Sequence, residues 1–203
     1  MAKTMSRVFQ IINNKFSLMP KLIIYNNKNK KIGYLRTKLF FRLSKSINVY
    51  QQNKAIQILF KIKRDNSNFL KHQYSIQNIN LTTDIKNLKI NHIGYRNIYK
   101  KSTYEIRADK KLYMAYERSS KITKISHLFL MIPIIGEFID SFLILIPITF
   151  EIFYYDITNN QKTKVANIII RSNLYKHSIQ IQIHDKNTNH DIIYLAFGIL
   201  LYF

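Results

Sequence analysis

Few side chains in this 203-residue chain have the types and spacing of a catalytic or metal site. Glu137 and Asp140 are three residues apart and would share one face of a helix. Apolar surroundings would raise the pKa of one carboxyl and suit the pair to acid–base work, although solvation or pairing with a lysine is the simpler interpretation. His184 and His190 flank Asp185 and offer a metal-binding cluster, but solvated turn residues are the stronger expectation there.

The usual sequence signatures of enzymes are missing. The four glycines are too far apart to form a phosphate-binding loop, and no serine lies in a G-x-S-x-G turn. The six histidines include no H-E-x-x-H motif, and the lack of cysteine removes thiolate nucleophiles, disulfides and cysteine-ligated zinc. We therefore expect a non-enzymatic protein without a metal or a cofactor.

The chemistry that the sequence does favour is binding of anions by its N-terminal half. Residues 1–102 hold 21 of the 32 Lys and Arg residues and only two acids, Asp65 and Asp84. The net charge of this half is therefore +19, whereas that of residues 103–203 is +2. A field of this sign attracts anionic lipid headgroups or nucleic acid. A solvated basic surface without a specific partner is the alternative interpretation.

Residues 28–64 combine these cations with aromatic residues, which are Tyr34, Phe40, Phe41, Tyr50 and Phe60. On a strand, alternate residues share a face, so Lys61 points with Lys63, and Arg36 with Lys38. Two such rows on neighbouring strands would form a cationic groove for anionic headgroups, or for single-stranded nucleic acid whose bases stack on the aromatics. The candidate anion-binding residues are Lys28, Lys30, Lys31, Arg36, Lys38, Arg42, Lys45, Lys61, Lys63 and Arg64.

Strands must position these residues. Alternation of apolar and polar residues predicts hairpins over residues 21–38, 102–118 and 150–170, and is clearest in residues 179–184. The expected apolar rows are Ile56, Ile58, Phe60 and Ile62; Tyr104, Ile106 and Ala108; Leu112, Met114 and Tyr116; and Ile179, Ile181 and Ile183. Residues 78–92 are the least patterned, which suggests a long loop or a short helix. Short strands between Asn- and Lys-rich turns predict an antiparallel sandwich or barrel.

The C-terminus breaks the strand pattern. Ile192–Phe203 contains only apolar or small residues, and Thr188 with Asp191 fits a capping box at the start of a helix. A helix that is apolar on every face must be buried on every face, and at roughly 15 residues, or about 22 Å, it is short for a bilayer. We expect a sheet to enclose it; a membrane tail or a last edge strand are the alternatives.

A second apolar segment, Leu128–Phe150, raises the question of a membrane span. Its Leu, Ile and Phe residues contribute roughly −7 kcal/mol to the free energy of membrane insertion. Glu137 and Asp140 together contribute about +6 kcal/mol, so the total is near zero. We prefer two pieces, a strand or loop to Ile135 and a helix or strand from Gly136 to Ile146. A true span, which would anchor an integral membrane protein, is the alternative.

The opening residues 21–34 consist of a strand, a polar turn rich in Asn and Lys, and the pair Ile32 and Gly33. Together with many strands and a final apolar helix, Asp191–Phe203, this resembles the tubby C-terminal, LURP-one and phospholipid scramblase superfamily, especially its small bacterial members. The resemblance implies a twelve-stranded barrel closed around a central helix. For the tubby branch it also implies phosphoinositide binding by basic residues of the barrel wall. The terminal signature of the eukaryotic tubby proteins is absent, so their headgroup specificity does not carry over.

These patterns predict a single domain over residues 1–203, mainly β, in which a closed antiparallel barrel of about twelve strands surrounds a central helix over residues 189–203. Asn13, Asn14 and Lys15 interrupt any N-terminal export signal, so a cytoplasmic location at the inner face of a membrane is expected. The expected role is peripheral binding to anionic phospholipid, with nucleic-acid binding or membrane anchoring through residues 128–150 as alternatives.

Overall fold

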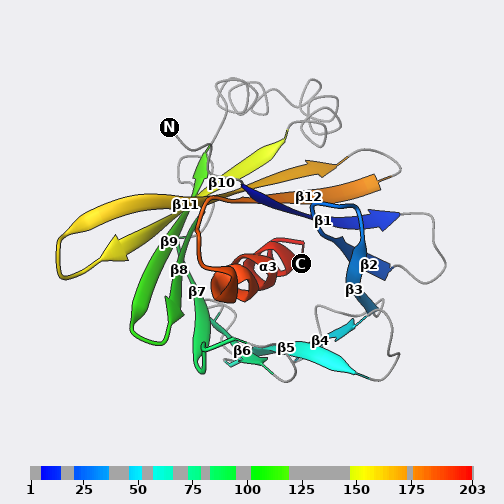
Figure 1. Ribbon diagram of the computed structural model, residues 1–203, viewed down its shortest axis with the longest axis horizontal. Helices are drawn as coiled ribbons and strands as arrows, with labels where there is room; N and C mark the ends of the chain where they lie inside the picture. Colours follow the sequence, from blue (N-terminus) through cyan, green and yellow to red (C-terminus); the bar gives the residue numbers. More distant parts are fainter. Residues whose placement is uncertain are drawn as a thin grey trace, which may run out of the picture.

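Alternating apolar and polar residues give this chain a sheet with one dry face. The computed structural model describes residues 6–14, 21–36, 46–51, 57–65, 73–78, 83–94, 102–118, 147–172 and 176–202. Within them, antiparallel strands form a closed barrel around a C-terminal helix (Figure 1). The strands are β1 (Arg7–Asn14), β2 (Lys21–Tyr25), β3 (Lys31–Arg36), β4 (Ser46–Gln51), β5 (Ile58–Arg64), β6 (Gln73–Asn78), β7 (Leu88–Gly94), β8 (Thr103–Ala108), β9 (Lys111–Arg118), β10 (Ile148–Asp156), β11 (Gln161–Ser172) and β12 (Lys176–Ile183). The predicted fold class is confirmed.

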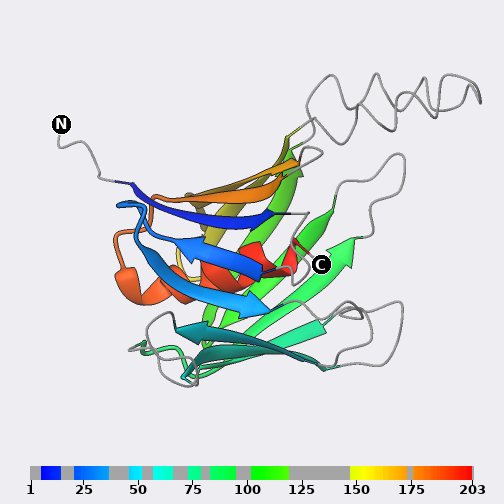
Figure 2. The same ribbon diagram turned by 90° about the vertical axis from the view of Figure 1, so that its right-hand side faces the viewer.

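Each strand pairs with its neighbour in the sequence, and β1 pairs with β12 to close the ring. The closing ladder runs from Arg7 opposite Ile183 to Asn14 opposite Lys176. Every strand therefore has two partners, and the sheet has no open edge. Figure 2 shows the helix running through the interior, between the β1–β12 ladder on one side and β4–β6 on the other.

The inner face of the barrel is aliphatic. Ile179, Ile181 and Ile183 on β12 have no exposed surface, while the alternating Gln180 and Gln182 remain partly exposed. This confirms the row predicted there. Equivalent inward rows on the other strands join one hydrophobic core with the helix.

The three expected hairpins are present as β2–β3, β8–β9 and β10–β11. Their turns place Asn29, Asp109 and Asn160 at φ of 53°, 51° and 50°. Asn and Asp tolerate this left-handed region better than other residues with a side chain, which explains how a chain with four glycines forms tight turns.

The helix enters the barrel after one short turn. A 3-10 helix, η2 (Thr188–His190), leads into α3 (Asp191–Leu200), and the residues from Ile192 to Ile199 are all buried. Phe197 packs edge-on against Phe150 and Tyr104, with ring centroids 5.8 and 5.0 Å apart. This confirms that the apolar C-terminus is covered by its own chain. A Cβ on Gly198 would lie 2.7 Å from Cδ1 of Ile181, so the missing side chain lets α3 approach β12.

The predicted capping box at Thr188 is wrong, although α3 begins at Asp191, the first residue of the helix given with the family resemblance. Thr188 lies inside η2, and the N-cap of that turn is Asn187, whose side chain accepts a hydrogen bond of 2.9 Å from the N–H of Asn189. The extra 3-10 turn delays α3 to Asp191, so the helix has 10 residues, about 15 Å, instead of the expected length.

Two strand predictions also need correction. Residues 78–92 contain most of β7, in which Leu88 and Ile90 are buried and Lys89 is exposed, an alternation too short to stand out in the sequence. On β9, the inward residues are Tyr113, Ala115 and Glu117, not the expected row Leu112, Met114 and Tyr116. The two-residue turn fixes the register, because it pairs Ile106 with Tyr113 and Tyr104 with Ala115, and paired residues share a face.

A bulge interrupts the predicted row on β5. Phe60 and Ile62 are buried as expected, but Val49 pairs with Phe60 while its neighbour Tyr50 pairs with Ile58. Two residues of β5 thus oppose one of β4, and Leu59 packs against the core in place of Ile58. Ile56 lies outside the described residues.

Residues 119–146 lie outside the described residues, so Glu137, Asp140 and the two-piece interpretation of Leu128–Phe150 stay predictions. The end of that segment, Ile148–Phe150, opens β10, and Phe150 is in the core. Across the described ranges, no helix has the length and apolar character to cross a bilayer.

Phe197→Ala is expected to lower the free energy of unfolding by about 4 kcal/mol, because it leaves a cavity where α3 meets the barrel wall. Denaturant titration measures the effect. Ile157→Ala, at a side chain that is 74% exposed, is the control and should change stability by less than about 0.5 kcal/mol. Equal effects of the two changes would contradict a core built on the helix.

Candidate functional site

The outer wall formed by β2–β5 carries five of the lysines that the sequence singled out. Lys28 and Lys30 are exposed in the β2–β3 turn, and Lys31 opens β3. Lys61 and Lys63 point outwards from β5, because the alternate side chains of that strand are in the core. We call these five residues the basic face.

Two tyrosines on this wall link the turn lysines to those of β5. Tyr34 on β3 pairs with Tyr50 on β4, and their rings stack with centroids 5.6 Å apart at 25°. Nζ of Lys31 lies 5.6 Å from the centroid of Tyr34. Asn48, two residues before Tyr50, pairs with Lys61. The outward side chains of Lys31, Tyr34, Tyr50 and Lys61 therefore follow one another across β3, β4 and β5.

Little negative charge opposes this surface. Within the described ranges, one carboxylate borders it, that of Asp65, which accepts a hydrogen bond of 2.6 Å from the hydroxyl of Ser75. Acids elsewhere bind their own partners: Asp191 pairs with Arg7 at 2.8 Å, and Glu105 with Arg107 at 2.8 Å. Among the described residues, the five lysines of the basic face are therefore balanced by a single neighbouring carboxylate, that of Asp65.

The structure adds a cation that the sequence analysis missed. Lys63 pairs with Ser75 on β6, Ser75 with Lys89 on β7, and Lys89 with Arg107 on β8. Lys89 is exposed and extends the positive surface beyond β5. The short alternation of Leu88, Lys89 and Ile90 was the available signal, and it lay in the stretch taken for a loop or a helix.

Other candidate residues are not brought to the basic face. Arg64 shares the inward side of β5 with Ile62 and pairs with Tyr74, which packs against the core. Arg36 ends β3, while Lys38, Arg42 and Lys45 lie outside the described residues. Because β4 separates β3 from β5, the expected rows are not on neighbouring strands, which removes the geometry on which the predicted groove depended.

The expected aromatic platform is also smaller. Phe60 is 1% exposed and belongs to the core, so it cannot stack on a ligand outside. Phe40 and Phe41 lie outside the described residues. Tyr34 and Tyr50 are the aromatic residues of the proposed set that the structure places on the outer wall.

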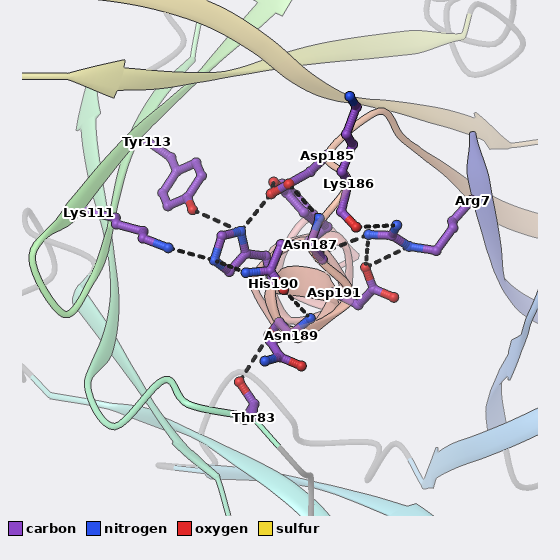
Figure 3. Close-up of polar contacts among 11 residues, drawn as sticks. Arg7, Thr83, Lys111, Tyr113, Asp185, Lys186, Asn187, Asn189, His190 and Asp191 are labelled. Atoms are coloured by element: carbon purple, nitrogen blue, oxygen red, sulfur yellow. Dashed lines mark hydrogen bonds and ion pairs between the residues drawn. The ribbon is translucent and has the colours of Figure 1, made fainter. Parts of the chain in front are cut away.

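Where α3 enters the barrel, a polar network ties the turn to three parts of the wall (Figure 3). Arg7 on β1 donates to Asp191 at 2.8 Å and to the carbonyl of Asn187 at 3.0 Å. Thr83, before β7, donates to the carbonyl of Asn189 at 2.9 Å. Nζ of Lys111 on β9 lies 2.8 Å from Nε2 of His190. We call residues 185–191 with these partners the closing cluster.

Asp185 is the centre of the closing cluster. Its carboxylate lies 2.6 Å from Nδ1 of His190 and accepts from the hydroxyl of Tyr194 at 2.9 Å and from the N–H of Asn187 at 2.9 Å. Burial alone would raise the pKa of Asp185, but these hydrogen bonds outweigh it and hold the pKa at about 2. His190 then donates from Nδ1, which leaves Nε2 to accept from Lys111.

The histidine predictions are thereby revised. His190 is 8% exposed and bonded on both ring nitrogens, so it is not the solvated turn residue expected from the sequence. His184 is exposed and lies 3.3 Å from Nδ2 of Asn167. The described part of the chain contains no group of three or more His, Asp or Glu side chains arranged to hold a metal ion.

A second set of inward polar groups lies where β8 begins and β9 ends. Glu117, which is 6% exposed, accepts a hydrogen bond of 3.1 Å from the N–H of Ser102. Tyr104 stacks on His92 with centroids 4.4 Å apart, and burial, with the nearby Tyr74 and Glu117, raises the pKa of Tyr104 to about 12. The sequence predicts Tyr104 in an inward row, but it places Glu117 outside, because it predicts Leu112, Met114 and Tyr116 as the inward row of β9.

Comparison of the chain with protein-family models, with curated proteins and with solved structures finds no match. The functional conclusion therefore depends on the geometry and charge of the wall itself.

Asp185→Asn is expected to remove an acid-sensitive part of the stability. The folded pKa of about 2 is below the ordinary value of 3.8, so the contribution is complete above that value and is lost as the pH falls through about 2. The wild type should lose about 2 kcal/mol more than the variant over this window. Denaturant titrations between pH 5 and pH 2 measure this loss as the difference in stability between the two proteins. The comparison is needed because Asp191, whose pKa is raised by burial, is present in both proteins. An identical acid dependence of the two proteins would contradict the role given to Asp185.

Proposed function

We propose that this protein is a non-enzymatic binding module that docks on anionic membrane lipid through the basic face. One observation carries the proposal: Lys28, Lys30, Lys31, Lys61 and Lys63 share an outer wall on which Asp65 is the one bordering acid within the described ranges. Each Lys near an anionic leaflet contributes about 1 kcal/mol, so four or five give useful peripheral affinity.

The form of the wall favours lipid over nucleic acid. Proteins that bind single strands track the backbone in a positive groove and stack bases on exposed rings. The basic face is the convex outside of a barrel, and its two tyrosines stack on each other with Lys31 over Tyr34. A broad convex surface of lysines and tyrosines suits a plane of headgroups better.

The same fold supports the resemblance to the tubby, LURP-one and scramblase superfamily. A twelve-stranded antiparallel barrel with an apolar C-terminal helix inside is the architecture that the resemblance implies. We propose membership of that superfamily and a location at the cytoplasmic face of a membrane, where the anionic lipids are concentrated.

Liposome flotation tests the role of the basic face. Lys61→Gln with Lys63→Gln should weaken binding to vesicles of mixed phosphatidylserine and phosphatidylcholine by about 2 kcal/mol, or roughly 30-fold. The matched control is Lys110→Gln with Lys186→Gln, which removes the same charge from two exposed lysines elsewhere and should change affinity by less than about threefold.

Three outcomes would overturn the proposal. Equal binding of the wild type to vesicles with and without phosphatidylserine would remove the dependence on anionic lipid. Equal losses in the two double variants would show that net charge alone drives association. Binding of single-stranded DNA with a steep negative salt slope, together with no capture by vesicles, would assign the wall to nucleic acid instead.

A further inference from the structure

The opposite wall of the barrel carries a cage of three aromatic rings around one ammonium group. Nζ of Lys162 on β11 lies 4.1 Å from the ring centroid of Phe153, 4.5 Å from that of Tyr116 and 5.5 Å from that of Tyr155. The rings of Tyr116 and Phe153 meet at 64°, which forms two walls of a corner. Three rings within about 6 Å of one cation make an aromatic cage.

Neighbouring strands hold the cage in shape. Tyr116 projects outwards from β9, and Phe153 and Tyr155 from β10, with all three rings only partly exposed. The hydroxyls of Tyr116 and Tyr155 lie 2.9 Å apart and join the two rings across strands. Burial and this bond raise the pKa of Tyr116 to about 12, while the pKa of Tyr155 is lowered because its oxygen accepts the bond and lies near Lys162.

The ammonium of Lys162 is not held by a carboxylate. Glu151, on the same side of β10, is bonded to Lys164 at 2.7 Å and to Arg118 at 3.3 Å. Among the residues that the structure describes, no acid forms an ion pair with Lys162. A primary ammonium is compact and strongly hydrated, so it gives up favourable water contacts to sit among rings.

A quaternary ammonium suits the same cage better. Its methyl groups cannot donate hydrogen bonds to water, and its diffuse charge is attracted by the faces of aromatic rings. Lys162 has a flexible four-carbon stem and sits on an exposed strand position, so its ammonium can leave the cage and return to solvent. The displaced ammonium stays close to whatever replaces it.

We propose that this cage, formed by Tyr116, Phe153 and Tyr155, binds the trimethylammonium group of a phosphocholine moiety, while the displaced Lys162 pairs with its phosphate. Phosphocholine fits because a two-carbon link keeps its phosphate within reach of the lysine that the choline expels. The cage on β9–β11 and the basic face on β2–β5 lie on opposite sides of the closed barrel, so the two sites act separately.

Ligand titration followed by the NMR shifts of the N-methyl protons tests the site directly, because ring currents shift methyl groups inside an aromatic cage. The wild type should bind phosphocholine several-fold more tightly than choline. Phosphoethanolamine, which has no N-methyl group, is added as a competitor and should displace phosphocholine only weakly. Lys162→Gln opens the cage and removes the phosphate partner, so it should bind choline more tightly than the wild type and lose the preference for phosphocholine. Phe153→Leu should weaken both ligands about tenfold.

Tyr25→Leu on β2 is the matched control, since it removes a partly exposed ring from the other side of the barrel and should leave both affinities unchanged. Thermal unfolding verifies that each variant is folded, and Lys162→Gln, at an exposed position, keeps the test decisive if Phe153→Leu is unstable. No shift of the N-methyl protons with either the wild type or Lys162→Gln at tens of millimolar ligand would overturn the inference. Shifts that persist unchanged in a folded Phe153→Leu protein would do the same.

Vesicles of phosphatidylcholine alone identify the source of the ligand. Capture of the wild type that is lost in Phe153→Leu assigns the cage to a lipid headgroup, and binding of soluble phosphocholine without capture assigns it to a free compound. Either result supports the site. Neither depends on phosphatidylserine, so failure of the cage and failure of the basic face are distinguishable.

Discussion

The structure depends on the need to cover an apolar helix on every side. The residues from Ile192 to Ile199 are all buried, and a single sheet layer cannot enclose a cylinder unless it closes on itself. The β1–β12 ladder provides that closure by joining residues far apart in the sequence. The closing cluster then fixes the helix start, with Arg7 and Lys111 reaching it from β1 and β9.

Much of this architecture could be predicted because it follows from local patterns. The alternation at Ile179, Ile181 and Ile183 and the apolar run after Asp191 define the dry face and its contents. The predictions that failed are those of inward rows on β5 and β9, because these rows depend on the register between strands. The bulge opposite Tyr50 exchanged Ile58 for Leu59, and the turn at Asp109 brought Tyr113 inside, neither of which periodicity alone can show.

The candidate site was predictable to the same degree. Lys61 and Lys63 face outwards because simple alternation holds for that part of β5, and Lys28 and Lys30 are exposed because they occupy a tight turn. Arg64 was misassigned since the same alternation turns it inwards. The cage around Lys162 gave no sequence signal, because its rings come from two hairpins and are brought together by strand pairing.

The order of the strands along the chain also constrains how the protein is made. Because β1 pairs with β12, the first strand has an unsatisfied edge until the last one has been synthesised, and the interior lacks its helix until later still. Until then, the isoleucine-rich inner faces of the intervening strands are exposed to solvent. A chain in this state is prone to associate with other chains. Nascent chains of this topology should therefore rely on chaperones for most of their synthesis, and on rapid closure once α3 is available.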